Sequence, residues 1–196
     1  DGGEEKIPQE DFCQLLGRTP RRVGQTYKYD SSYEEIARAL PRFSATYMIE
    51  RERFFRALLF NYLVANGDAH LKNFSLHRVE QGYRFTPAYD LVCTKLHLPH
   101  EARLALDLLA EGEPWRDQDT HGFPTGNTWL EFAEVIGVRR VRALGHLREI
   151  CAPERQARVE ELIARSFLGA EARQEYLRIL RDRHRALRIC EEDLSC

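Results

Sequence analysis

The feature that most restricts the fold of this chain is the apolar segment between Ile49 and Ala65. Its large apolar side chains recur at helical spacing: Phe54, Phe55, Leu58, Leu59, Tyr62 and Leu63. The apolar face is so broad that we expect this helix to be buried, with other elements packed around it. Asn66-Gly67 follows directly, and this pair predicts the C-terminal cap of the helix.

Two shorter helices are predicted before the buried one. The first begins at Pro8-Gln9-Glu10-Asp11, with proline in its first turn and acidic residues where the helix dipole favours them, and Gly17 ends it. Ser31 or Ser32 caps the second, which runs to about Leu40.

The rest of the chain predicts one hairpin followed by helices. Two β-prone runs, residues 73–79 and 83–86, flank the turn Glu80-Gln81-Gly82. Beyond Asp90 the pattern is again helical, after a segment that contains Pro99. A Gly- and Pro-rich surface loop precedes three or four amphipathic helices, predicted at about 128–136, 139–150, 153–168 and 171–190. The fold class that results is mainly α, a helix-rich lobe with one short β-hairpin.

Charge and cysteine content exclude several classes of protein. The 196 residues include 29 Lys and Arg against 31 Asp and Glu, so no global basic field exists for direct nucleic-acid binding. Five scattered cysteines show no zinc-site spacing and favour a reducing compartment. Since no signal peptide and no apolar run of ~20 residues is present, we expect a soluble, cytoplasmic protein without membrane contact.

The residues that indicate chemistry lie between the buried helix and the hairpin. Asn66-Gly67-Asp68-Ala69-His70-Leu71-Lys72-Asn73 places several polar groups in a few positions, and Asp90 follows the second β-run. Asp68 and Asn73 have the spacing of the Asp and Asn in a protein-kinase catalytic loop. Because a hairpin brings its two ends together, Asn73 and Asp90 are predicted to meet at one ion.

These residue types suit phosphoryl transfer. A carboxylate (Asp90) and an amide oxygen (Asn73) are ligands that Mg²⁺ accepts. Asp68 is then placed to take the proton of a hydroxyl nucleophile. Lys72 is predicted to steady either the transferred phosphate or the Asp68 carboxylate.

The motifs resemble the C-terminal domain of HipA-family kinases, which are toxins of bacterial toxin–antitoxin modules. The resemblance is clearest over about residues 5–110, and the helical remainder agrees only loosely. It rests on four stretches that agree in order and spacing: residues 66–75 (NGDAHLKNFS), 86–91 (TPAYDL), 8–14 (PQEDFCQ) and 28–30 (KYD).

The resemblance implies a kinase-like fold, ATP and Mg²⁺ as cofactors, and phosphorylation of serine or threonine in a protein target. For the family such targets are translation components, for example an aminoacyl-tRNA synthetase, and the partner is a DNA-binding antitoxin. By position, Asp68 corresponds to the catalytic base, and Asn73 and Asp90 to the Mg²⁺ ligands. His70 and Lys72 correspond to members of the same loop; His70 either braces it by bonding a backbone carbonyl or takes part directly.

The family resemblance also predicts an organisation. Residues 1–7 are expected to end a loop from an N-terminal lobe, 8–110 to form the catalytic core of the C-lobe, 111–127 a surface loop and 128–196 a helical subdomain. The chain starts with Asp1, and no Gly-rich phosphate loop precedes Pro8. We therefore expect a fragment that folds alone, binds ATP weakly and has no measurable turnover. Asp90 is followed by Leu91 and Val92, so the DFG glycine of ordinary protein kinases is absent.

Two other functions fit the same residues. A catalytically silent lobe would serve only to dock an antitoxin or another partner, and it would not bind ATP in a magnesium-dependent manner. A metal-dependent hydrolase would use Asp68, His70, Asn73 and Asp90, and it would bind zinc or manganese tightly without nucleotide.

Overall fold

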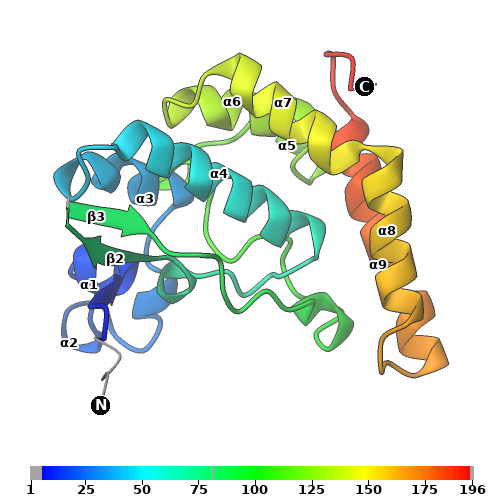
Figure 1. Ribbon diagram of the computed structural model, residues 1–196, viewed down its shortest axis with the longest axis horizontal. Helices are drawn as coiled ribbons and strands as arrows, with labels where there is room; N and C mark the ends of the chain where they lie inside the picture. The colour runs from blue at the N-terminus through cyan, green and yellow to red at the C-terminus, as the bar shows by residue number, and fades with distance from the viewer. Residues whose placement is uncertain (1–5, 81, 195–196) are drawn as a thin grey trace.

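The buried helix predicted from the sequence forms the centre of the molecule. The computed structural model describes residues 6–80 and 82–194, and helix α4 (Tyr47–Leu63) crosses it with other elements on several sides (Figure 1). Phe54, Phe55 and Leu58 have no exposed surface at all. Two groups of aromatic rings pack on α4: Phe54 contacts Phe74 at 5.3 Å between ring centroids, and Tyr62 contacts Trp129 at 5.3 Å.

The predicted hairpin is confirmed, and a third strand extends its sheet. β2 (Ser75–Val79) and β3 (Gly82–Phe85) pair antiparallel with Leu76 opposite Phe85. β1 (Gln9–Asp11) pairs antiparallel with the other edge of β2, and Glu10 lies opposite Leu76. Of the predicted turn, residue 81 lies outside the described residues.

A helix beginning at Pro8 is therefore a wrong prediction. Residues 9–11 gain a full strand partner in β2, and the Pro8 carbonyl accepts a hydrogen bond from the Arg78 backbone N–H at 3.0 Å. This long-range pairing outweighs the local helix signals. The helix α1 (Phe12–Leu15) begins only afterwards, where Asp11 Oδ1 accepts from the backbone N–H of Gln14 at 3.0 Å.

The next segment confirms the second predicted helix. Short helix α2 (Pro20–Val23) and the 3₁₀ turn η1 (Tyr27–Tyr29) precede α3 (Tyr33–Ala39), and the 3₁₀ turn η2 (Leu40–Arg42) follows it. Of the two candidate caps, Ser32 caps α3, through a capping box with Glu35.

The helical segment predicted beyond Asp90 is not found. The chain runs irregularly there, with only the 3₁₀ turns η4 (Thr94–Leu96) and η5 (Ala110–Gly112). Distant partners hold this segment: Tyr33 and Glu34 donate their backbone N–H groups to the carbonyls of Asp107 and Leu108. Contacts with the start of α3 thus determine a conformation that sequence periodicity does not encode.

The four C-terminal helices are confirmed as α6 (Gly126–Val135), α7 (Arg140–Cys151), α8 (Pro153–Ala164) and α9 (Ala170–Arg188). A single turn, α5 (Gln118–His121), lies within the predicted surface loop. In Figure 1, α8 and α9 lie side by side and project as an arm. One hydrophobic cluster joins residues from both halves of the chain, for example Phe12, Phe54 and Leu187. In the described part of the chain, no helix has both the length and the apolar character needed to cross a bilayer.

Candidate functional site

The polar loop between α4 and β2 begins with a backbone reversal at Ala65. This residue has a φ of 58°, in the left-handed region, and its N–H donates to the carbonyl of Tyr62 at 3.2 Å. The prediction that Asn66-Gly67 provides the cap is therefore wrong by one to two positions. The left-handed residue therefore precedes Asn66, whose side chain bonds back to Asn61 on α4.

Asn66 connects three segments of the site. Its side chain is buried, and its Nδ2 donates to Asn61 Oδ1 on α4 at 2.7 Å and to the carbonyl of Asp90 at 2.9 Å. Its Oδ1 accepts from the backbone N–H of Asp68 at 3.2 Å. Sequence reasoning missed this role, although an amide side chain with donors and an acceptor is suited to such a bridge.

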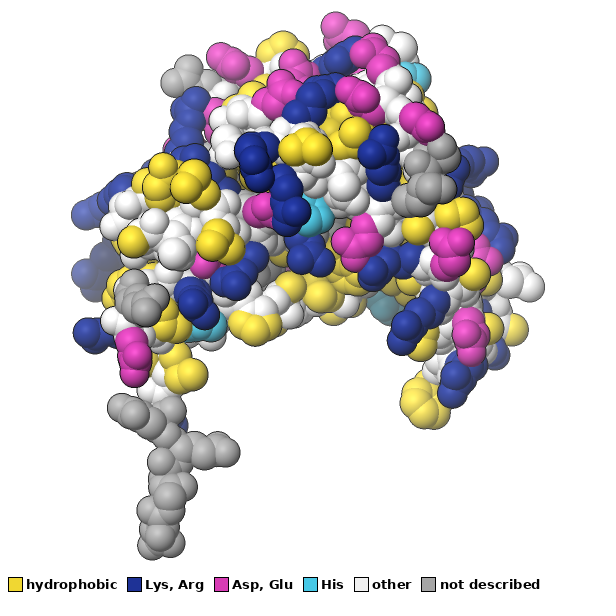
Figure 2. Space-filling model, turned by 45° about the horizontal axis from the view of Figure 1, so that its top comes forward, with side chains coloured by type: hydrophobic (Ala, Val, Ile, Leu, Met, Phe, Trp, Pro, Cys, Tyr) yellow, Lys and Arg dark blue, Asp and Glu magenta, His cyan; other side chains and the backbone are white. Residues whose placement is uncertain are grey.

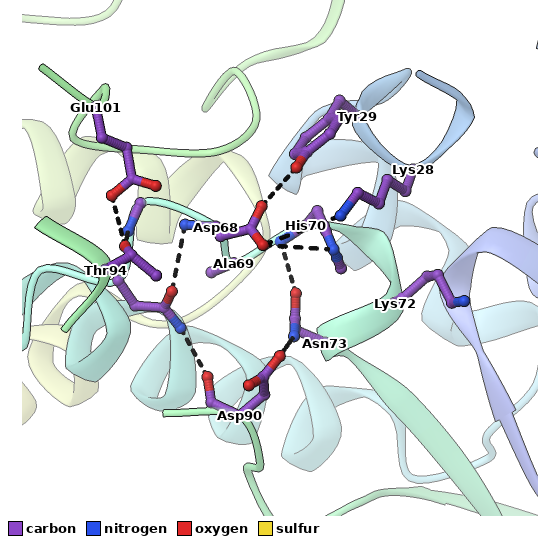
Figure 3. A network of polar contacts seen from close by, with 12 residues as sticks. Lys28, Tyr29, Asp68, Ala69, His70, Lys72, Asn73, Asp90, Thr94 and Glu101 are labelled. Carbon is purple, nitrogen blue, oxygen red and sulfur yellow. Dashed lines mark hydrogen bonds and ion pairs between the residues drawn. The ribbon is translucent and has the colours of Figure 1, made fainter. Parts of the chain in front are cut away.

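Gly67 lies where two chain segments approach closely. A Cβ at this position would be 2.6 Å from the backbone oxygen of Ala102 and would overlap the Glu101 carboxylate. The Gly67 N–H donates to Thr94 Oγ1 at 2.7 Å, and the Thr94 hydroxyl donates to Glu101 at 2.5 Å (Figure 3). Neither Thr94 nor Glu101 is predicted as part of the site, since no local pattern in the sequence marks either residue.

Asp68 presents its carboxylate at the surface of the site, with 43% of the side chain exposed. Tyr29 donates its phenol hydroxyl to Asp68 Oδ1 at 2.5 Å, and Lys28 Nζ lies 4.0 Å from Asp68 Oδ2 (Figure 3). Burial, followed by the hydrogen bond to Asp68, raises the pKa of Tyr29, so the phenol remains a donor. Of the Lys28-Tyr29-Asp30 stretch, Lys28 and Tyr29 thus lie at the site beside Asp68.

His70 is buried beside Asp68. Its Nε2 is 3.9 Å from Asp68 Oδ2, and its ring packs edge-on against Tyr29 at 5.3 Å between centroids. Burial, followed by the charge of Lys28, lowers the pKa of His70. Nδ1 of the ring is buried without a hydrogen-bond partner among the described residues, so this nitrogen does not make the bond to a backbone carbonyl that was one of the two predicted roles.

Lys72 does not pair with Asp68, so that part of the prediction is wrong. The Lys72 side chain is exposed and points away from the Asp68 carboxylate in Figure 3, and Lys28 takes the position beside Asp68 instead. The Lys72 carbonyl accepts from the Tyr89 hydroxyl at 2.5 Å. Residue 72 lies on the outer side of the turn η3 (Leu71–Asn73), which accounts for the direction of its side chain.

Asn73 and Asp90 meet as the hairpin geometry predicts. Asn73 Nδ2 donates to Asp90 Oδ2 at 2.6 Å, and Asn73 Oδ1 accepts from the His70 backbone N–H at 2.9 Å. Figure 3 shows Asn73 between Asp68 and Asp90. The three side chains that sequence reasoning singled out first therefore belong to one network.

Asp90 is held in an unusual backbone conformation. Its φ is 54°, in the left-handed region that Asp tolerates better than most residues. The bond from Asn66 to its carbonyl fixes this conformation, and Tyr89 anchors the preceding residue through Ser75 Oγ at 2.6 Å. Strained residues that the surroundings hold in place are concentrated at functional sites.

The donor set at Asn73 and Asp90 fits a hard cation. The Asp90 carboxylate and the second lone pair of Asn73 Oδ1 are oxygen ligands of the kind Mg²⁺ takes with water and phosphate oxygens. Among the described residues there is no group of three His, Cys, Asp or Glu side chains placed to hold a metal ion. Cys93 is close in sequence, but burial raises the pKa of its thiol, as expected of a packing residue.

Comparisons with known proteins identify the family of the chain. The model of the HipA-like C-terminal domain family matches residues 1–161. A protein of Sinorhizobium fredii named "Putative kinase Y4mE" is 32% identical over 142 residues, covering 70% of this chain and 31% of the relative. The serine/threonine-protein kinase toxin HipA of Shewanella oneidensis is 41% identical over 56 residues, which cover 29% of this chain and 13% of that protein.

The fold agrees with a solved structure as well. HipA in the complex of Shewanella oneidensis HipA, HipB and operator DNA matches with a TM-score of 0.70 at 23% identity, covering 95% of this chain and 46% of that one. The chain thus spans less than half the length of these relatives. With a family model that covers most of its residues, the chain belongs to the family of HipA-like C-terminal domains, whose named relatives are kinases.

Proposed function

We propose that this chain supplies the catalytic base and the magnesium ligands of an ATP-dependent serine/threonine protein kinase. The observation that carries the proposal is the contact of Asn73 with Asp90, 2.6 Å from Nδ2 to Oδ2, beside an Asp68 whose side chain is 43% exposed. An exposed acid next to a pair of oxygen ligands is what transfer of a phosphoryl group to a protein hydroxyl requires. The names of the relatives support the reaction class.

Asp68 is proposed to orient the acceptor hydroxyl and to take its proton. The hydroxyl oxygen of a serine or threonine then bonds to the γ-phosphorus of ATP, while the bond from phosphorus to the ADP oxygen breaks. Tyr29 and Lys28 hold the Asp68 carboxylate in one orientation. The exposure of Asp68 allows a side chain of another protein to reach it.

Asp90 and Asn73 are proposed to hold Mg²⁺. When bound, the ion neutralises charge on the phosphates of ATP. The Asn66 bond to the Asp90 carbonyl keeps the carboxylate turned toward Asn73. Lys72, whose ammonium group is exposed, remains available for a phosphate oxygen. His70 is proposed to support the Asp68 side of the loop, since its Nε2 lies 3.9 Å from Oδ2 of that carboxylate.

The partner proposed is a DNA-binding antitoxin. The support is the solved complex of HipA with HipB and operator DNA, to which this chain is similar in fold. The protein target, a translation component such as an aminoacyl-tRNA synthetase, remains a prediction from the family resemblance. A cytoplasmic location remains a prediction from the scattered cysteines.

Transfer of labelled γ-phosphate from ATP to protein tests the proposal in a longer protein that contains this chain, because the chain alone is expected to have no measurable turnover. Asp68→Asn and Asp90→Asn should each lower the rate by about 100-fold or more, the usual contribution of a positioned base or metal ligand. Asp119→Asn, at an exposed aspartate of α5, is the matched control and should leave the rate unchanged. An undiminished rate in either site variant would overturn the assignment.

A further inference from the structure

A second concave surface lies outside the Asp68 network, between the body of the molecule and the α8–α9 arm. This cavity has a volume of about 770 Å³ and is lined by α4, the β2–β3 hairpin, the segment after β3, and helices α7 to α9. In Figure 2 the molecule is hollowed beside the arm, and dark blue Lys and Arg side chains stand on both sides of the hollow. We call it the arm groove.

The floor of the arm groove is apolar. Ala57 and Phe60 contribute from α4, Leu162 from α8 and Leu91 from the segment after β3. Phe60 is 38% exposed, Leu91 39% and Leu162 59%. Apolar side chains from three elements that line one hollow form a contiguous patch, and such patches on soluble proteins mark sites of interaction.

The walls of the arm groove are positively charged. Among the described residues, two acidic side chains line it, Glu149 and Glu160, and three histidines add donors. Six arginines line it: Arg53, Arg56, Arg84, Arg155, Arg158 and Arg181.

Part of this charge is compensated within the chain. Arg53 bonds to Glu50, Arg155 to Glu149, and Arg181 to Glu160. Arg84 on β3 and Arg158 on α8 are exposed, and neither makes an ion pair with another described residue. Because arginine stays protonated at any physiological pH, these two opposite walls offer guanidinium groups to an external carboxylate.

We propose that the arm groove binds an acidic, amphipathic helical segment of a partner protein. The apolar face of the segment would cover Phe60, Leu91 and Leu162, while its carboxylates would meet Arg84 and Arg158. The stretch of α4 that lines the groove, residues 53–63, is about 15 Å long, which matches a partner helix of about three turns. The apolar floor is complementary to the apolar face of such a helix, and the basic walls are complementary to its carboxylates.

The apolar floor also distinguishes this ligand from a nucleic acid. A phosphate backbone is bound by basic side chains with polar surroundings, and the bases need aromatic platforms for stacking. Among the described lining residues, the aromatic rings are Phe60, Phe85 and histidines, and Phe85 is buried in the core. The proposal is independent of the kinase activity, since the groove uses neither Asp68 nor Asn73.

Binding of designed peptides to the full chain tests the proposal by fluorescence polarisation. The probe is a labelled peptide of about 12 residues with Glu on one helical face and Leu on the other. One comparison peptide carries Lys in place of Glu, and another has the same composition in an order without an apolar face. The expected result is saturable binding of the acidic amphipathic peptide, at least tenfold tighter than either comparison peptide.

Variants of the chain then locate the binding. Arg84→Glu combined with Arg158→Glu should weaken the acidic peptide at least tenfold, and Leu162→Asp should weaken it as well. These positions are exposed, so folding should be retained, as circular dichroism can verify. Arg21→Glu, at an exposed arginine outside the groove, should change nothing. The proposal is overturned by absent binding, by equal binding of the Lys peptide, by an unaffected double variant, or by tighter binding of a single-stranded oligonucleotide.

Discussion

The Asp68 loop and the α8–α9 arm use polar groups in opposite ways. In the loop, buried amides are shared among several segments: Asn66 bonds to Asn61, Asp68 and Asp90, and Asn73 bonds to His70 and Asp90. On the arm, charged side chains pair at the surface, as Arg178 does with Glu175 on α9.

The difference determines how strongly the side chains of each region are held in one conformation. A buried donor or acceptor that loses its partner costs the full desolvation of that group, so the loop has few alternative conformations. Exposed ion pairs gain little in water and are easily exchanged for others. The loop is therefore suited to hold reacting groups in place, and the arm to adapt to a docked partner.

The largest effect is expected at Asn66. Asn66→Ala removes three hydrogen bonds from a buried site and should lower the free energy of unfolding by about 3 kcal/mol, since each unsatisfied partner costs about 1–3 kcal/mol. Urea unfolding measures the change. Gln174→Ala, at an exposed amide on α9, is the control, and its free energy of unfolding should stay close to that of the parent chain. Equal stability of the two variants would remove the distinction between loop and arm.

A smaller effect is expected from the titration of His70. Burial lowers the pKa of His70 below the ordinary value of 6.5, so the unfolded chain binds the proton more readily than the folded one. Its contribution to stability is complete above about pH 6.5 and decreases as the pH falls below that value toward the lowered pKa.

His70→Gln should therefore flatten the decline in unfolding free energy between neutral and mildly acidic pH. Burial also lowers the pKa of His184, so this residue still contributes to the decline in unfolding free energy in the His70 variant. His97→Gln, a change at an exposed histidine, serves as the control in the same urea titrations. An unchanged slope in the His70 variant would show that this ring is not held in its uncharged form by the loop.

The smallest effect is expected on the arm. Arg178→Ala removes a surface pair with Glu175 on the same helix, and no change of the urea midpoint should be measurable. Raising the salt concentration should leave the parent chain and the variant equally stable. A clear loss of stability would mean that exposed charges on α9 contribute to the fold as the buried amides do.

Sequence reasoning succeeded where the signals are local or covalently constrained. Periodicity placed α4 and the C-terminal helices, and a serine cap at Ser31 or Ser32 placed α3. The meeting of Asn73 with Asp90 followed from a hairpin, because a hairpin joins its ends whatever else the chain does.

Predictions from the sequence were wrong where contacts with residues distant in the sequence determine the conformation. Residues 9–11 have helix-start chemistry but form a strand, because β2 offers an edge. Lys72 is nearest in sequence to Asp68, yet Lys28 reaches it from η1. The roles of Thr94 and Glu101 depend on a segment held by α3, which no local pattern reveals.

The most direct test of the proposed metal and nucleotide site is paramagnetic broadening in the amide spectrum of the labelled chain. Substoichiometric Mn²⁺, added with ATP, stands in for Mg²⁺ and detects even weak binding. We expect selective broadening of the amides of residues 66–75 and 88–92, reversed by excess Mg²⁺ and lost in Asp90→Asn but not in Asp119→Asn. Broadening centred elsewhere, or retained in Asp90→Asn, would contradict the proposed site.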